Sequence, residues 1–563
     1  MPQIGYAHRP VALGRQGMVA AAHPLATLAG IETLKSGGTA ADAAVAVNGV
    51  LAVTQPNLCG LGGDLFCLYY EAATRRVHSL NGSGRSGSRA SVDELARRGL
   101  PRLPVIGPPT VSVPGCVRAW AMLLERFGTR PLGELLGPAI NAADGFPISA
   151  LVSQAIREYT SVTPDAEWQR VFTRDGRAPA LGELFTQPEL ARTLRALAAE
   201  GPDLFYTGSV GQAIARRLER DGFLTAADLA AHTGEWGEPI STTYRGVRVF
   251  ETPPPTQGLA VLLALNLLEG FPLATLTVHS VEHLHLLLEM VKLAYADRDR
   301  WIGDPAHARL PVDALLSKAY AARRQAQFDP EKAQSFAFGD PEGDTTGFVV
   351  ADPAGNVVSV IQSLFNGFGS GVVVPGTGVT LQNRGRHFSL DPSHPAVLEP
   401  RKRPFHTLIA SIATRDDRPV LAFATMGGNG QAMFHAQVLT NVFDYGMDIQ
   451  EAIERPRFLI GAFLPGDAAD TTHIEARVPG SVLAALVRCG HHVMEAPEFF
   501  TRAGHAHGIV LRDGTHGRRR SAGRRYRAGV LVRNSRPPSA GFAGATDPGG
   551  RFRKGGEAPL RAN

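Results

Sequence analysis

The pattern of apolar and polar positions divides the chain into a mainly helical first part and a strand-rich second part. An Ala- and Val-rich run predicts a helix that begins at Thr39, where Asp42 can complete a capping box, and ends before Pro56. An apolar run predicts a buried strand over residues 66–70, and strand and hairpin patterns dominate residues 346–425. Further helices are predicted over residues 116–160, 185–220 and 280–300. Helices that flank such strands indicate a layered α/β or α+β fold.

One predicted hairpin carries two hydroxyl groups at its open end. Residues 347–351 and 357–362 read as strands, joined by a turn that contains Pro and Gly. If the two ends of the turn face each other, the register places Thr345 opposite Ser363. Directly opposed residues have Cβ atoms about 4.5–5.5 Å apart, so the two side chains would lie next to each other. A slip of one residue would separate them.

Charge is unevenly distributed along the 563 residues. Lys and Arg number 57 and Asp and Glu 52, and the 44% of apolar residues is typical of a globular protein. Residues 515–563 hold 12 basic and 2 acidic residues, which leaves 45 and 50 for the rest of the chain. The mildly acidic body gives no reason to expect a nucleic-acid partner. The Arg-rich tail, with Arg518–Arg520, leaves nucleic-acid binding open as a separate, non-enzymatic function, although its composition favours disorder.

Several classes of protein are not expected from this sequence. It has no run of about 18 apolar residues that would span a membrane, and its N-terminus lacks an apolar signal core. Four scattered cysteines are too few for a disulfide framework, so we expect a cytoplasmic protein with reduced thiols. The glycine-rich residues 59–64 follow a helix and lack the third glycine of a dinucleotide fingerprint, so no cofactor is expected.

Motifs in a fixed order over residues 15–514 resemble those of the γ-glutamyltransferases, which are N-terminal-nucleophile hydrolases with a threonine nucleophile. The matching segments are residues 17–26, 37–45, 344–346, 368–371, 375–378, 402–404, 426–428 and 454–458. The resemblance implies a four-layer αββα fold built as one interwoven domain. It also implies a precursor that cleaves itself into a large subunit, 1–344, and a small subunit, 345–514. The resemblance ends near residue 514, and the composition of 515–563 predicts a basic, disordered tail. The two fragments would remain a heterodimer, which can itself pair.

The same resemblance implies the roles of individual residues. The hydroxyl of Thr345 would attack the carbonyl carbon of Asp344, and cleavage would free the α-amine of Thr345. Such an amine has a pKa of about 7.7–8.0 and can act as the base for the neighbouring hydroxyl. Thr346 is the rival nucleophile, and Ser363 matches a position whose hydroxyl hydrogen-bonds the nucleophile. The oxyanion hole is assigned to Gly427 and Gly428.

The predicted substrate-binding positions depart from those of γ-glutamyl enzymes. Asn, Gln and Asp, which hold the donor amine in those enzymes, are replaced by Phe365, Arg384 and His387. In place of the Arg and two Ser that hold the carboxylate, this chain offers Arg85, His406 and Thr407. Arg binds carboxylates well and ammonium groups poorly, so we expect a small amide with an acidic acyl group and no nearby amine.

Such a pocket resembles the branch that includes oxamate amidohydrolase, with hydrolysis or transfer to an amine as the outcome. An ordinary γ-glutamyl donor such as glutathione is the first alternative, and a cephalosporin-type acylase is another. A zinc peptidase is a further reading, because His279, Glu282 and His283 spell an inverted zinc motif. No third acidic ligand is identifiable, so no metal is expected.

Overall fold

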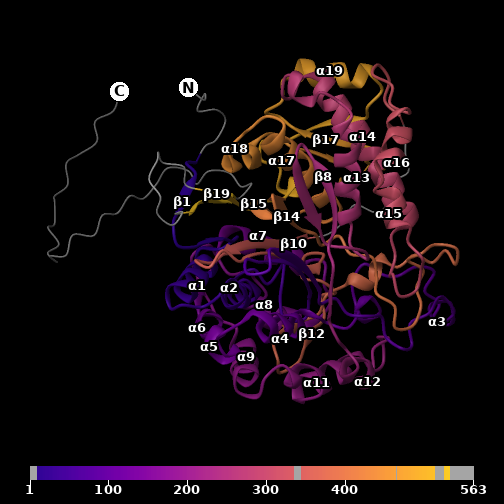
Figure 1. Cartoon of the computed structure of the whole chain (residues 1–563). Coiled ribbons are helices and arrows are strands. Elements are labelled where there is room, and N and C mark those ends of the chain that lie inside the picture. The colour runs from indigo at the N-terminus through magenta and orange to yellow at the C-terminus, as the bar shows by residue number, and fades with distance from the viewer. Residues whose placement is uncertain (1–8, 335–343, 465, 514–524, 533–563) are drawn as a thin grey trace, which may run out of the picture.

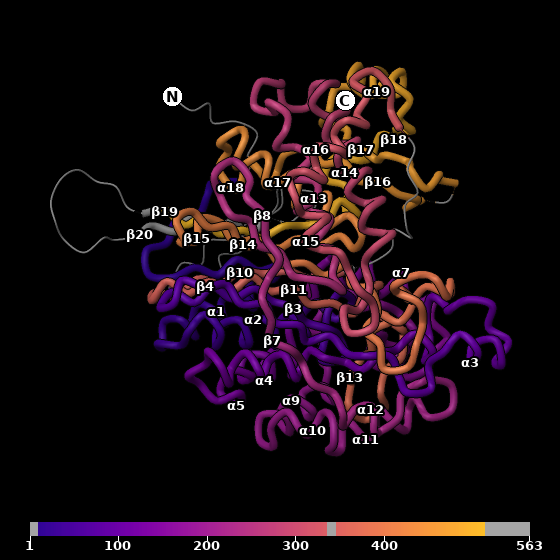
Figure 2. Tube along the Cα trace, turned by 45° about the vertical axis from the view of Figure 1, so that its right-hand side comes forward, coloured from indigo at the N-terminus to yellow at the C-terminus, as the bar shows by residue number. Residues whose placement is uncertain are grey.

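Two stacked β-sheets form the centre of the molecule, and a layer of helices covers the outer face of each (Figures 1 and 2). The computed structural model describes residues 9–334, 344–464, 466–513 and 525–532. Within these residues one sheet has seven strands, in the order β1 (Ala12–Gly14), β20 (Arg525–Val532), β19 (Ala506–Asp513), β15 (Arg418–Thr425), β14 (Ala410–Arg415), β9 (Val247–Glu251) and β8 (Ile240–Tyr244). The other has six, in the order β2 (Met18–Ala20), β10 (Asp344–Ala351), β11 (Val357–Phe365), β3 (Asp64–Glu71), β4 (Arg76–Asn81) and β7 (Glu235–Gly237).

Three apolar cores hold the four layers together. Buried side chains such as Phe66, Ile361 and Ile412 fill the space between the two sheets. A second core lies under the helices that cover the six-stranded sheet, which include α1 (Pro24–Lys35), α2 (Ala40–Thr54), α4 (Cys116–Phe127), α6 (Gly137–Asp144) and α9 (Pro188–Glu200). A third lies under the helices on the seven-stranded sheet, which include α13 (Gly258–Glu269), α14 (Val281–Trp301), α17 (Gln431–Phe443) and α18 (Ile449–Glu454). The expected αββα layering is confirmed.

Helix α2 begins as its sequence predicts. The Thr39 hydroxyl accepts a hydrogen bond from the Asp42 N–H, and the Asp42 carboxylate accepts one from the Thr39 N–H, which completes the capping box. Every residue of α2 is buried, because the helix lies between the sheet and the outer helices. Small Ala and Val side chains suit this position, since they let the backbones approach closely.

The hairpin of β10 and β11 has the predicted register along most of its length. Thr346 pairs with Gln362, and the following pairs run without interruption to Ala351 and Val357. Between Asp344 and Thr346 the register shifts by one residue, so that Thr345 on β10 lies opposite two residues of β11, Ser363 and Leu364. The shift falls at the position where the sequence places the nucleophile.

Strand β20 departs from the sequence expectation. The segment 515–563 was expected to be disordered, yet Arg525–Val532 pairs with β19 along eight positions and with β1 on its other side. The expectation of disorder therefore does not hold for these residues. Their run Tyr-Arg-Ala-Gly-Val-Leu-Val has strand-forming residues at its end, and the backbone of β19 offers an edge to pair with. The rest of the tail, Arg518–Arg520 included, lies outside the described residues.

Cys59, Cys67, Cys116 and Cys489 are all free thiols. None of the helices in the described ranges combines the length and the apolar character needed to cross a bilayer.

Candidate active site

Thr345 lies fully buried between the two sheets, at the start of β10. Its Oγ1 is 3.4 Å from Ser363 Oγ on β11, which is longer than a usual hydroxyl–hydroxyl hydrogen bond. Ser363 Oγ in turn accepts a hydrogen bond of 2.7 Å from the Phe365 N–H. The two hydroxyl groups that the hairpin register predicts to be neighbours are therefore brought together.

Thr346 points to the opposite face of β10. Its hydroxyl donates to Gln55 Oε1 at 3.0 Å, at the end of α2. Successive strand residues face opposite sides, so the two threonines cannot share one site. This geometry favours Thr345 over its rival as nucleophile.

Gln431, the first residue of α17, makes a further contact with the Thr345 hydroxyl. Its side-chain amide is buried and lies 3.2 Å from Thr345 Oγ1. In the orientation that satisfies both ends of the amide, the oxygen accepts from Thr345 Oγ1. The nitrogen then donates to the carbonyl oxygens of Thr407 and Thr425, at 3.1 and 3.3 Å. Gln431 thus ties the candidate nucleophile to the seven-stranded sheet.

The glycine loop, which we define as Gly427–Gly430, joins β15 to α17 beside these residues. Gly427 and Gly428 have φ values of +139° and +52°, which side chains other than glycine adopt only with strain. A Cβ on Gly427 would also collide with the Phe434 ring. The Gly427 carbonyl accepts from the Gly430 N–H at 2.8 Å, so the Gly428 N–H of the same peptide unit points the other way. A backbone amide with its direction fixed in this way suits an oxyanion hole.

A buried cation lies next to Thr407. Arg384 is fully buried and donates through Nη1 to Thr407 Oγ1 at 3.0 Å, while its guanidinium lies over the Phe365 ring at 4.3 Å. Its Nε and Nη2 have no hydrogen-bond partner. Burial lowers the pKa of Arg384 to about 9, so the group remains charged at neutral pH. A buried guanidinium with two unused donors is suited to an anion.

The two histidines predicted at this site are neutral. Burial, which is complete for His406 and partial for His387, lowers the pKa of each well below its usual value. His387 packs on the Phe365 ring with 4.1 Å between ring centroids, and neither ring nitrogen of His406 has a partner. The sequence predicts His387 as a potential cation, and the lowered pKa corrects this prediction. Arg384 alone supplies a positive charge among five clustered residues, which are Phe365, Arg384, His387, His406 and Thr407.

Asp64 is a carboxyl group that faces this arginine. It begins β3 and is paired with Ser363 in the ladder between β11 and β3. Its Oδ1 accepts from the Gly84 N–H at 3.2 Å, and its Oδ2 has no partner. Burial raises the pKa of Asp64 to about 7, although the Arg384 charge and nearby N–H groups oppose the rise. Near neutral pH its charge is therefore adjustable.

Arg85, the other predicted carboxylate ligand, has partners elsewhere. It donates to Asp304 and to Glu235, both at 3.1 Å, and its side chain is 32% exposed. These bonds use both terminal nitrogens of its guanidinium in ion pairs. The structure therefore groups Arg384, and not Arg85, with the candidate nucleophile.

The inverted zinc motif does not form a metal-binding arrangement. The His279 N–H donates to His283 Nδ1 at 3.2 Å, so that nitrogen is already used as a backbone acceptor at the start of α14. Glu282 is exposed, whereas His283 is buried. These residues do not fit a zinc peptidase site.

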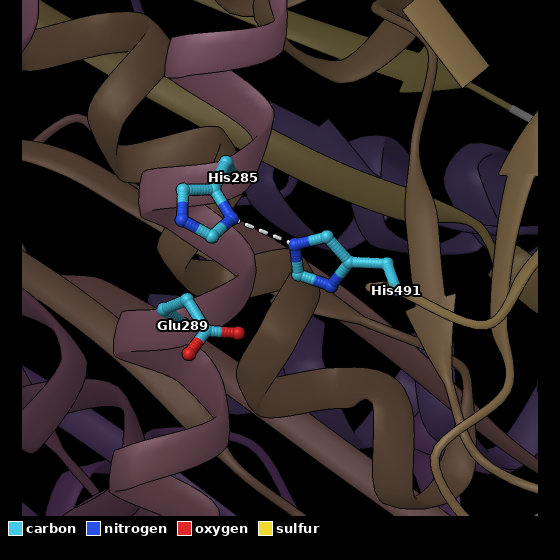
Figure 3. Close-up of side chains that lie close together, drawn as sticks. All are labelled: His285, Glu289 and His491. Carbon is cyan, nitrogen blue, oxygen red and sulfur yellow. Dashed lines mark hydrogen bonds between the residues drawn. The ribbon is translucent and has the colours of Figure 1, made fainter. Parts of the chain in front are cut away.

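Figure 3 shows the group of His and Glu side chains that, within the described ranges, comes close enough to share an ion: His285, Glu289 and His491. His285 Nδ1 lies 2.8 Å from His491 Nε2. The Lys292 ammonium donates to Glu289 at 3.0 Å and lies 3.1 Å from His491 Nδ1. Backbone groups of residues 329–334 satisfy the remaining atoms of His285 and Glu289. An ammonium already occupies the place of a cation, so the cluster is a hydrogen-bond network.

Sequence reasoning missed Gln431 and Asp64. Both stand beside glycine-rich motifs, three residues after Gly428 and directly after Gly63, and that proximity is the only signal in the sequence. A polar residue in the first turn of a helix or at the start of a strand is commonly exposed. Only the stacking of the two sheets shows that both are buried.

Comparisons with known proteins show which family this chain resembles over most of its length. The sequence model of the family described as Gamma-glutamyltranspeptidase matches residues 26–528. The glutathione hydrolase-like YwrD proenzyme of Bacillus subtilis is 38% identical over 505 residues, which cover 89% of this chain and 95% of that protein. The oxamate amidohydrolase proenzyme of Klebsiella pneumoniae is 35% identical over 503 residues, 88% of this chain and 94% of that one. The crystal structure of cephalosporin acylase from Bacillus halodurans has a TM-score of 0.86 and 36% identity, and covers 95% of this chain and 97% of that one. The chain therefore belongs to the gamma-glutamyltranspeptidase family and is an enzyme that acts on amide bonds.

Proposed function

We propose that this precursor cleaves itself between Asp344 and Thr345 and then uses Thr345 to hydrolyse a small amide with an acidic acyl group. The observation that carries the proposal is the buried cluster in which the Thr345 hydroxyl meets Ser363 and Gln431, next to Arg384 with two unused donors. Relatives named as proenzymes support the cleavage. No cofactor is needed for this chemistry.

The mature enzyme would act by two acyl transfers. Thr345 Oγ1 attacks the amide carbon while its proton passes to the freed α-amine, and the Gly428 N–H faces the oxyanion. The C–N bond then breaks as the α-amine passes the proton to the leaving nitrogen of the substrate. An ester between the acyl group and Thr345 remains. Water, activated by the same α-amine, attacks this ester and releases the acid. An amine in place of water would give transfer.

The charges at the site indicate which acyl group the enzyme accepts. Arg384 suits a carboxylate, whereas the Phe365 ring and the neutral His387 and His406 offer no anion for a donor ammonium group. The relative named oxamate amidohydrolase has a name that fits such a substrate. The relative named for glutathione makes a γ-glutamyl donor the first alternative, and the cephalosporin acylase neighbour suggests another. A cytoplasmic location and pairing of two processed heterodimers remain predictions.

The test combines cleavage and turnover. The purified protein should contain fragments of 344 and 563 − 344 = 219 residues. Thr345→Ala should leave one uncleaved chain and lower amide hydrolysis by at least about a thousandfold. Thr346→Ala, the matched control, should still be cleaved. Ammonia release from oxamate should be faster than aniline release from a γ-glutamyl anilide.

Two results would contradict separate parts of this proposal. Cleavage of Thr345→Ala at the same bond would exclude Thr345 as the nucleophile. Faster turnover of the anilide would change the acyl group and leave the mechanism intact.

A further inference from the structure

We propose that Gln257 and Arg298 are positioning residues that hold the glycine loop in its reactive shape. This inference rests on the proposed function, because it concerns the oxyanion that forms during attack by Thr345. Both residues belong to the segment 1–344, whereas the loop belongs to 345–563. The large fragment would thus set the geometry of a site whose reacting groups lie in the small fragment.

Gln257 precedes α13 and is fully buried behind the loop. Its Nε2 donates to the carbonyl oxygens of Gly428 at 2.9 Å and of Thr407 at 2.8 Å. Its Oε1 accepts from Arg298 Nη1 at 2.8 Å. Both polar atoms of the side-chain amide are therefore hydrogen-bonded. Only an amide can donate two hydrogen bonds and accept one in this planar arrangement.

Arg298 and Tyr295, from one face of α14, complete the support. Arg298 Nη1 also donates to Asn429 Oδ1 at 3.2 Å, and its other nitrogens pair with Asp299 at 2.6–2.7 Å. The Arg298 guanidinium lies over the Tyr295 ring at 4.0 Å, and the Tyr295 hydroxyl donates to the Asn429 carbonyl. Three donors from the large fragment therefore contact two consecutive loop residues, Gly428 and Asn429.

These contacts fix where the loop amides point. In a trans peptide the C=O and the N–H are antiparallel. The Gly428 carbonyl is held toward Gln257, so the N–H of the same peptide unit, which is that of Asn429, points away from Gln257. The Gly427 carbonyl is held by the Gly430 N–H, which fixes the Gly428 N–H in the same manner. A preset donor needs no rearrangement when the oxyanion forms, which is the condition for strong electrostatic stabilisation.

The experiment uses Gln257→Glu in the full-length, processed protein. A carboxylate of the same shape keeps the bond from Arg298 but turns the two donated bonds into repulsion with the carbonyl oxygens. We expect kcat to fall on the order of 100-fold with KM changed less than about threefold, since loss of an oxyanion donor costs about 10²–10³. The affinity for a boronic acid that forms a tetrahedral adduct with Thr345 should fall in parallel, and that for the free acid product should not.

Gln437→Glu is the matched control. Gln437 on α17 is buried and also donates to two carbonyl oxygens, those of Met433 and Phe458, both at 3.1 Å. It should lose thermal stability without the selective loss of boronate affinity. If Gln257→Glu remains uncleaved, Tyr295→Phe, which removes one donor to the loop, replaces it in the same assays.

Three outcomes separate the possibilities. An unchanged kcat in a cleaved Gln257→Glu or Tyr295→Phe enzyme would overturn the inference. Equal losses in the Gln257 and Gln437 variants would reduce Gln257 to a structural residue and would also overturn it. A wild-type enzyme that is inactive toward every amide would instead refute the proposed function.

Discussion

Thr345, Gln431 and Arg384 are fully buried, although each carries polar atoms that would bind water if exposed. The sequence predicts Thr345 and its neighbour Ser363, because a hairpin register relates nearby positions by simple pairing. It does not predict Gln431 or Asp64 at the site. Their positions depend on how two sheets stack, and no local pattern encodes that stacking.

The ionisation of Asp64 should make substrate binding depend on pH. Its pKa is raised to about 7 by burial, so it is mainly neutral below that pH and mainly charged above it. A charged Asp64 competes with an anionic substrate for Arg384. KM for oxamate should therefore rise between about pH 6 and pH 8, by about fivefold if the bound anion raises the pKa by about one unit.

Asp64→Asn carries the control for this effect. It keeps the shape of the side chain and cannot ionise, so its KM should stay flat over the same range. Steady-state kinetics at several pH values measures both, and kcat separately reports the α-amine of Thr345. An identical rise in the variant would assign the pH dependence to another group.

Among the elements, those with strong local signals were predictable and those that depend on a distant partner were not. The capping box of α2 and most of the register of the β10–β11 hairpin follow from a few neighbouring residues. The register shift opposite Thr345 and the pairing of β20 do not. β20 is identified by its contacts with β19 and β1, which lie far from one another in the sequence.

Removal of β20 tests its contribution. A chain that ends at residue 514 leaves β1 without its strand partner and β19 without a neighbour on one side. β19 pairs with β15, which leads into the glycine loop, so we expect both stability and activity to fall. The unfolding midpoint should drop by at least about 2 °C, as for a loss of about 2 kcal/mol in a cooperative unit of about 500 residues.

A chain that ends at residue 532 is the comparison, because it retains β20 and removes only later residues. Thermal unfolding and oxamate turnover of both chains measure the contribution of β20 to stability and activity. Equal behaviour of the two truncated chains would mean that β20 contributes nothing measurable.

In the whole molecule the two expected fragments are interleaved in both sheets. β2, β3, β4 and β7 of the segment 1–344 flank β10 and β11 of the segment 345–563, and the seven-stranded sheet also mixes strands of both. The four-layer architecture was expected from the family resemblance. Composition and periodicity alone predict only a layered fold of helices and strands, because they contain no information on which strands are neighbours.

Cleavage should therefore leave the molecule in one piece. We expect the processed protein to elute from a size-exclusion column as a single species that contains both fragments, and to separate only in denaturant. The network of His285, Glu289, Lys292 and His491 joins both segments and adds to their contact. Elution of either fragment alone in native buffer would contradict the interleaved topology.

The position of β10 between β2 and β11 has a genetic consequence. A central strand is inserted into its sheet while the chain folds. The segments 1–344 and 345–563 of one active site therefore come from the same polypeptide. Two damaged alleles, one with a lesion before the scissile bond and one with a lesion after it, would then fail to complement each other in the same cell.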